Sequence, residues 1–295
     1  MKKTFKKISH CKGFREFCAG LGLSEFVFEG IKNVVNLRKL NANPDQNSLT
    51  YIESAKLIDR CSIPQKAVVL VPEGHFSDCQ FTSIHVGSPS YVFWSLYEFL
   101  ERSKISESPS KISSDCVIGS NVSISKFGVI IEENVFIGDN AVIKAGVIIK
   151  KGAKIGPGSV VGSNGLEVKD TSFGRVVITH SGGVLIGENV ELGALCTINQ
   201  GLGDVATQID TDTKIDSGVH IAHSCSVGPR NIISANVTFG GSVKTGADIF
   251  IGLNSTIKNR IEIADGCFVG ASSFVAESYK SAVKIVPRAA KPLPL

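Results

Sequence analysis

The sequence predicts a mainly β protein, a parallel β-helix of hexapeptide repeats that follows a small N-terminal α/β domain. The first observation is a six-residue period of large apolar residues through the second half of the chain. A helix repeats about every 3.6 residues and a strand every second residue, so neither explains this period. A coil with three flat sides of six residues does explain it, and one coil then takes about eighteen residues. The inward positions are Ile209, Ile215, Ile221, Val227, Ile233, Phe239, Thr245, Ile251, Ile257, Ile263, Val269 and Val275, with Thr245 as the polar exception.

The same period is found upstream, in registers that shift. One register covers 131–161 and another, offset by one residue, covers 112–130, so we expect a slip near Ile130. A third run covers 186–198. At about eighteen residues each, these runs predict about eight coils. Two stretches fit no register and are rich in Gly, Asp, Ser and Thr, which favours loops that leave the coil, and these are 163–177 and 200–208.

The pattern before residue 112 differs from the repeat. Segment 14–21 has the apolar spacing of a short helix, 67–71 is typical of a buried strand, and 91–100 again has helical spacing. A polar stretch that contains Pro109 precedes the first repeat. The predicted organisation is therefore a small α/β domain over 1–102, a linker over 103–111, a β-helix domain over 112–278 and a short C-terminal tail over 279–295.

Composition narrows the classes of function. The net charge of +4 would favour an anionic ligand, such as a nucleotide, coenzyme A or an acidic carrier protein, without requiring nucleic acid. We expect no transmembrane segment, because no run of about 18 apolar residues occurs. The basic N-terminus is not followed by an apolar segment, so we expect no secretory signal. The eight cysteines stand singly, which favours a reducing cytoplasm.

The strongest candidate for chemistry is His223, two residues after the inward Ile221 and therefore at a corner of the coil. Eighteen residues further, on the next coil, the sequence has Gly241. An imidazole that accepts a proton beside a backbone N–H that stabilises an oxyanion is suited to acyl transfer. Asp216 lies shortly before His223 and could orient its ring or pair with its charge. The alternative is a solvated corner histidine without a catalytic role.

Around these residues the chain resembles the UDP-3-O-acylglucosamine N-acyltransferases of lipid A biosynthesis. The resemblance rests on Lys214-Ile215-Asp216 and Ile221-Ala222-His223, and it continues upstream through 162–166, 182–187 and 197–201. It implies a left-handed β-helix, an exception to the usual right-handed crossover, in a homotrimer with sites between subunits. It also implies that His223 is the general base and that Gly241 is the oxyanion donor. The implied reaction transfers an acyl group, a 3-hydroxyacyl group in that family, to the amine of a UDP-linked amino sugar.

The resemblance also assigns substrate-binding residues in both domains. Tyr51 stands where one uracil-stacking aromatic is expected, which would give the small domain a uridine-nucleotide site, whereas Leu57 replaces the second aromatic. Asn164 and Asn199 stand where the family has Asp. The sequence is compatible with two roles for Tyr51, packing inside the small domain and stacking on a ligand.

Two further residues complete the predicted substrate-binding set. His220 matches a histidine of the UDP-N-acetylglucosamine O-acyltransferases, and Arg260 aligns with a second histidine of the N-acyltransferases. We expect no tightly bound cofactor, only an acyl carrier protein thioester or acyl-coenzyme A as co-substrate. The tail 281–295 resembles that of coenzyme A-dependent sugar acetyltransferases, so N-acetylation of a nucleotide-linked amino sugar is the alternative. Basic residues that could meet an acidic carrier are Arg260, Lys280, Lys284, Arg288 and Lys291.

Two readings from other classes stay open. Some hexapeptide proteins are zinc-dependent carbonic anhydrases, and His180, His220 and His223 are the set that could be proposed here. His220 and His223 occupy different places in the hexad and should not converge, so we expect no metal. A β-helix without catalytic activity, a scaffold, is the other reading.

Overall fold

The computed structural model describes residues 13–21, 23, 31, 36–37, 48–53, 63, 65, 67–73, 81–103 and 108–287. The chain divides into two compact units. The first comprises Met1–Lys104 with Leu166–Thr179, and the second comprises Ile105–Gly165 with His180–Leu295. The boundary at Lys104 falls inside the predicted linker. Much of the stretch predicted as a loop over 163–177 belongs to the first unit, which no local sequence pattern indicates.

The first unit is an α/β arrangement around a parallel sheet. Its described elements are α1 (Phe14–Gly20), β1 (Asn36–Leu37), β2 (Ser48–Tyr51), β3 (Val68–Pro72), β4 (Thr82–Val86), α3 (Pro89–Ser103), β14 (Val168–Thr171) and β15 (Gly174–Val177). The sheet has the order β1-β2-β3-β4, and β14 and β15 form an antiparallel hairpin. The two helices and the strand predicted from the sequence are confirmed, and α3 buries Phe93 and Leu96. No helix among the described residues has the length and apolar character needed to cross a bilayer.

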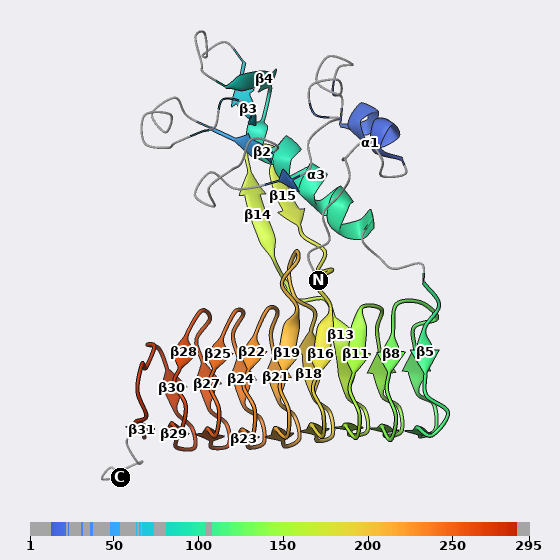
Figure 1. Cartoon of the computed structure of the whole chain (residues 1–295). Helices are drawn as coiled ribbons and strands as arrows, with labels where there is room; N and C mark the ends of the chain where they lie inside the picture. The colour runs from blue at the N-terminus through green and yellow to red at the C-terminus, as the bar shows by residue number, and fades with distance from the viewer. Residues whose placement is uncertain are drawn as a thin grey trace, which may run out of the picture. The chain divides into compact units, whose positions relative to one another are not determined.

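The second unit is a parallel β-helix of three faces, and Figure 1 shows its coils stacked in one row from β5 to β30. The first face contains β5 (Lys111–Ile112), β8 (Ile130–Ile131), β11 (Val147–Ile149), β16 (Val184–Ile186), β19 (Thr207–Ile209), β22 (Ser226–Val227), β25 (Lys244–Thr245) and β28 (Glu262–Ile263). The second face contains β6 (Val117–Ile118), β9 (Phe136–Ile137), β12 (Lys154–Ile155), β17 (Glu191–Leu192), β20 (Lys214–Ile215), β23 (Ile232–Ile233), β26 (Phe250–Ile251), β29 (Phe268–Val269) and β31 (Lys284–Ile285). The third face contains β7 (Ser123–Ile124), β10 (Val142–Ile143), β13 (Val160–Ser163), β18 (Thr197–Asn199), β21 (His220–Ile221), β24 (Thr238–Phe239), β27 (Thr256–Ile257) and β30 (Phe274–Val275).

The six-residue period marks the residues that form the core of this unit. From Ile209 to Val275 every predicted inward residue is buried, and each apolar one stacks on its counterpart one coil away, as Ile221 does on Ile198 and Phe239. The mainly β class, the parallel β-helix and the estimate of about eight coils are confirmed. The left hand of the coil is what the resemblance implies.

Two details of the coil differ from the prediction. Ile131 is buried and Ile130 is 42% exposed, so Ile130 is not the last inward residue of the first register. Ile124 pairs with Ile143, nineteen residues on, which places the extra residue of the slip between Ile124 and Ile131. The coil also continues past residue 278 to β31, which pairs with β29. Ile285 follows Val275 by ten positions, which is not a multiple of six, so a six-residue count misses this last strand.

The polar rung at Thr245 has a partner inside the coil. Asn231 is buried, and its Nδ2 donates to Thr245 Oγ1 at 3.1 Å and to the carbonyls of Gly228 and Gly246 at 3.0 and 2.9 Å. Its Oδ1 accepts from the Ile249 N–H at 2.7 Å. Burying an amide is tolerated when its donors and acceptors are satisfied in this way. Thr245 is therefore one part of an internal hydrogen-bond network.

Asn231→Leu is expected to lower the free energy of unfolding by about 2–4 kcal/mol, because it removes the acceptor of the Ile249 N–H and the amide donor to the Gly246 carbonyl. Denaturant unfolding followed by circular dichroism measures the change. Thr238→Val, on the exposed surface of β24, is the control and should change stability by less than about 0.5 kcal/mol. If the hydrogen bonds of Asn231 do not stabilise the fold, both variants will be equally stable.

Candidate functional site

His223 lies at the corner where the chain passes from the third face to the first. It follows β21, whose Ile221 is fully buried, so the corner is fixed by the core beneath it. The carbonyl of His223 accepts from the Ser242 N–H at 2.9 Å, and the Ala222 N–H donates to Phe239 O at 3.2 Å. These bonds tie the corner to the next coil. The imidazole is half-buried, as an outward corner side chain should be.

Gly241 lies against the His223 imidazole on that next coil. A Cβ on Gly241 would stand 2.5 Å from His223 Nε2 and 2.7 Å from Cε1, closer than van der Waals contact allows. The absence of a side chain at Gly241 is therefore what makes room for the ring. The Gly241 carbonyl accepts from the Arg260 N–H at 2.9 Å, which links the third coil of the corner. Arg260 itself is exposed.

His180 lies beside His223, an approach that the sequence did not indicate. The two ring centroids are 5.1 Å apart and the rings are tilted by 55°, and His180 is buried. Gly165 lies close to both rings: a Cβ there would stand 3.1 Å from His180 Nε2 and 3.4 Å from His223 Cδ2. The sequence indicates His180 only as one of three histidines that could be proposed to bind zinc. It stands between the stretch 163–177 and the next run of the repeat, where no period places a side chain.

Asn199 and Asn164 have separate surroundings. Asn199 is buried, and its Nδ2 donates to Ser163 Oγ at 2.8 Å and to the backbone carbonyl of Asn164 at 3.2 Å. The neighbouring Gln200 donates from Nε2 to Gly162 O at 2.7 Å. The Asn199 amide thus fixes the backbone that leads to Gly165, beside the two imidazoles. The Asn164 residue itself is exposed.

Asp216 follows β20 at the corner between the second and third faces, so one whole side of the coil separates it from His223. Its Oδ1 accepts from the Ser217 N–H at 2.7 Å. Within one chain, the structure therefore does not bring Asp216 to the His223 ring, which differs from the prediction that Asp216 orients this ring. The period itself indicates this, because seven residues exceed one side of a six-residue repeat.

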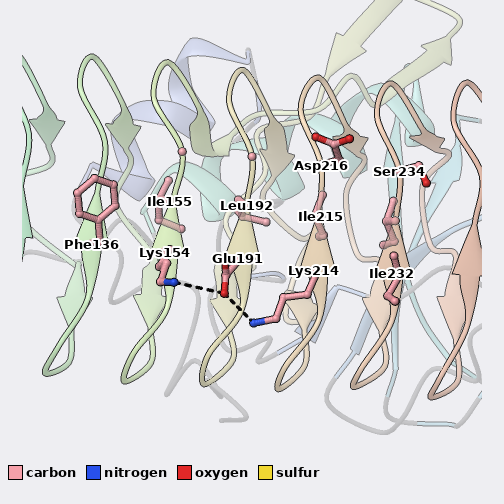
Figure 2. Close-up of a pocket in the computed structure, with 13 residues that line it drawn as sticks. Phe136, Lys154, Ile155, Glu191, Leu192, Lys214, Ile215, Asp216, Ile232 and Ser234 are labelled. Carbon is pink, nitrogen blue, oxygen red and sulfur yellow. Dashed lines mark hydrogen bonds and ion pairs between the residues drawn. The ribbon is translucent and has the colours of Figure 1, made fainter.

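Asp216 instead lines a groove of about 470 Å³ on the second face. Figure 2 shows the Glu191 carboxylate between the ammonium groups of Lys154 and Lys214, at 3.4 and 3.0 Å. The hydrogen bond from Lys214 holds the pKa of the Glu191 carboxyl below its usual range. Phe136 and Ile232, 42% and 53% exposed, add an apolar lining. The groove lies on another side of the coil from the His223 corner.

The other predicted substrate-binding residues have contacts of their own. His220 is in the third face between Thr197 and Thr238, and burial lowers the pKa of its imidazole. Tyr51 is engaged inside the first unit: its ring packs against Phe93 at 4.9 Å between centroids, and its hydroxyl accepts from Trp94 Nε1 at 3.3 Å. Leu57, Arg288 and Lys291 lie outside the described residues.

Neither a metal cluster nor a cysteine nucleophile is present among the described residues of this corner. No three His, Cys, Asp or Glu side chains in the described part of the chain are grouped to hold a metal ion. Burial raises the pKa of the Cys225 thiol, two residues after His223, to about 12, and its Sγ donates to Gly240 O at 3.2 Å. A thiol in that state is an inert core side chain at neutral pH. The imidazole of His223 is thus the proton acceptor at this corner that is not fully buried, since the neighbouring His180 is buried.

Comparison with known proteins agrees with the six-residue repeat. Residues 128–163 match the family model described as bacterial transferase hexapeptide (six repeats). A UDP-3-O-acylglucosamine N-acyltransferase from Sulfurimonas denitrificans is 34% identical over 103 residues, 35% of this chain and 32% of the relative. Residues 128–163 are therefore similar to the hexapeptide repeats of bacterial transferases. An acyl-[acyl-carrier-protein]–UDP-N-acetylglucosamine O-acyltransferase from Campylobacter concisus is 30% identical over 168 residues, 56% of this chain and 57% of the relative.

The similarity covers part of each relative. The chain spans about a third to just over half of the length of these two hexapeptide-repeat relatives. Among solved structures, a UDP-N-acetylglucosamine acyltransferase from Campylobacter jejuni matches with 28% identity and a TM-score of 0.37, over 57% of this chain and 66% of that one.

Proposed function

We propose that this protein is an N-acyltransferase that moves an acyl group from a thioester to the amine of a UDP-linked amino sugar, in lipid A or lipopolysaccharide synthesis in the cytoplasm. The observation that carries the proposal is the His223 imidazole packed against the bare Cα of Gly241. The named relatives, acyltransferases of UDP-linked glucosamines, support the substrate class.

The chemistry needs one base and one oxyanion donor. The sugar amine attacks the thioester carbon, a C–N bond forms and the amine proton passes to the His223 imidazole. The backbone N–H at Gly241 stabilises the tetrahedral oxyanion, and the missing Cβ leaves space for the thioester beside the ring. The C–S bond then breaks, and His223 returns the proton to the leaving thiolate. No tightly bound cofactor takes part.

The test is a thiol-release assay with a panel of donors and UDP-amino sugars, with products identified by mass. The proposal expects thiol release that depends on the sugar, fastest with a 3-hydroxyacyl group on acyl carrier protein. Added salt should slow that reaction, because carrier docking on exposed residues such as Arg260 and Lys280 is electrostatic. Faster turnover with acetyl-coenzyme A, unaffected by salt, would assign the acetyltransferase alternative. No thiol release with any pair would leave the scaffold reading.

Assembly into a homotrimer belongs to this proposal. A half-buried corner imidazole needs a second wall to exclude water, and the groove on the second face offers exposed apolar residues, Phe136 and Ile232. If the His223 corner of a second copy occupies that groove, Asp216 meets the imidazole of a neighbour. That pairing would give Asp216 its predicted role between chains.

Light scattering is expected to give three times the chain mass of 31.3 kDa. Ile232→Glu, which places a charge in the groove, should dissociate the assembly and reduce activity at least tenfold, because each site loses its second wall. Ile130→Glu, on the equally accessible surface of the first face, is the matched control and should change neither. An active monomer at assay concentration would contradict the trimer.

A further inference from the structure

His180 is a buried ionisable side chain that lies next to the His223 ring. It comes from the start of the chain segment that re-enters the β-helix after the 166–179 excursion. Its backbone neighbourhood is fixed: the Gly182 N–H donates to Gly201 O at 2.8 Å, and a Cβ on Gly182 would stand 2.5 Å from Val205 O. A side chain carried on such a tightly packed backbone has little freedom to move.

The His223 ring is thereby enclosed on two sides. One side is the tilted His180 ring at 5.1 Å together with Gly165, and the other is Gly241 on the next coil. Tilted aromatic pairs at this separation attract beyond simple area burial. A corner side chain that pointed into open solvent would sample several rotamers, and each would place Nε2 at a different position.

We infer that His180 is a positioning residue, which holds the plane of the His223 imidazole so that Nε2 faces the space beside Gly241. His180 is buried, so it acts through His223 and not by contact with substrate. The inference deepens the acyl transfer proposed above and rests on it for its kinetic test. An error of about 1 Å in the position of a catalytic group can cost about 100-fold in rate, so a residue that fixes a ring is worth that much.

Steady-state kinetics of three variants test the role. His180→Ala should lower kcat about 10- to 100-fold and leave KM for both substrates within about threefold, because substrate binding is unaffected. His180→Phe retains a ring of similar width and should recover kcat to within about fivefold of wild type, whereas His180→Gln should not. Val184→Ala, a truncation of the core in the adjacent β16, is the control: it should lower stability without changing kcat.

A second measurement does not depend on turnover. In a protein labelled at its six histidines, the carbon-bound ring protons of His223 should shift in His180→Ala and stay near their wild-type positions in Val184→Ala. If wild type shows no acyl transfer but this shift occurs, the proposed reaction fails and the positioning stands. A kcat within twofold of wild type in His180→Ala, or recovery by Gln and not by Phe, overturns the inference. If His180→Ala does not fold, the comparison of Phe with Gln decides.

Discussion

His223→Ala is expected to lower kcat by about 10²–10⁴-fold while the coil stays folded, the largest effect of any single substitution at this corner. The imidazole points outward from Ile221, which is buried and holds the corner in place without it. The variant removes the only proton acceptor that we assign to the reaction. Thiol release under saturating substrates measures kcat, and circular dichroism confirms the fold.

His220→Ala is the matched control for that variant, three residues earlier on β21. Its side chain lies on the third face between Thr197 and Thr238, so its loss should cost much less and act mainly on KM. A His223→Ala variant with near-normal kcat would remove this imidazole from the mechanism. A larger loss at His220 than at His223 would move the base to β21.

Gly241→Ala should lower kcat by about 10- to 1000-fold, with little change in stability. The added methyl group would start 2.5 Å from His223 Nε2, so the imidazole must rotate away, which moves the base and fills the space beside it. The ring can swing toward solvent because the corner is half-exposed, so the fold does not carry the strain. Kinetics and a thermal melt on the same preparation separate the two effects.

The control uses the same place in the hexad on another side of the coil. Ala247 already carries a Cβ at such a corner, which shows that the backbone there does not require glycine. Ala247→Ser should therefore leave kcat and melting temperature nearly unchanged. Equal losses in Gly241→Ala and Ala247→Ser would show that corners in general resist change and that His223 has no special relation to Gly241.

Much of this molecule follows from a period of six. The period predicts which side chains enter the core, and one added coil length connects His223 with Gly241, because parallel coils stack residues eighteen apart. It also places the slip, although only pairing shows that the extra residue precedes Ile131. These features are predictable because each depends on a repeat that the chain itself displays.

Features without a period escape such reasoning. His180 reaches His223 only because the 166–179 hairpin returns at a particular point, a tertiary event with no local signature. Asn231 appears as an ordinary polar residue until its bonds to Gly246 and Ile249 are seen. Tyr51 could pack or stack by sequence, and its contacts with Phe93 and Trp94 become visible only in the fold. The position of a side chain that depends on one contact with a residue distant in sequence cannot be predicted from a periodic pattern.

His223 stacks on Gly241 only because one full coil of eighteen residues separates them, so the length of the chain between them determines whether they meet. Inserting six residues there would leave every buried side chain still facing inward, since the core accepts any multiple of one side. The imidazole, however, would then stand a third of a revolution away from its glycine. The core therefore tolerates insertions of any multiple of six residues, whereas the His223 corner tolerates only multiples of eighteen. A descendant of this chain could lengthen in steps that its hydrophobic interior cannot distinguish, and only whole revolutions would keep the chemistry.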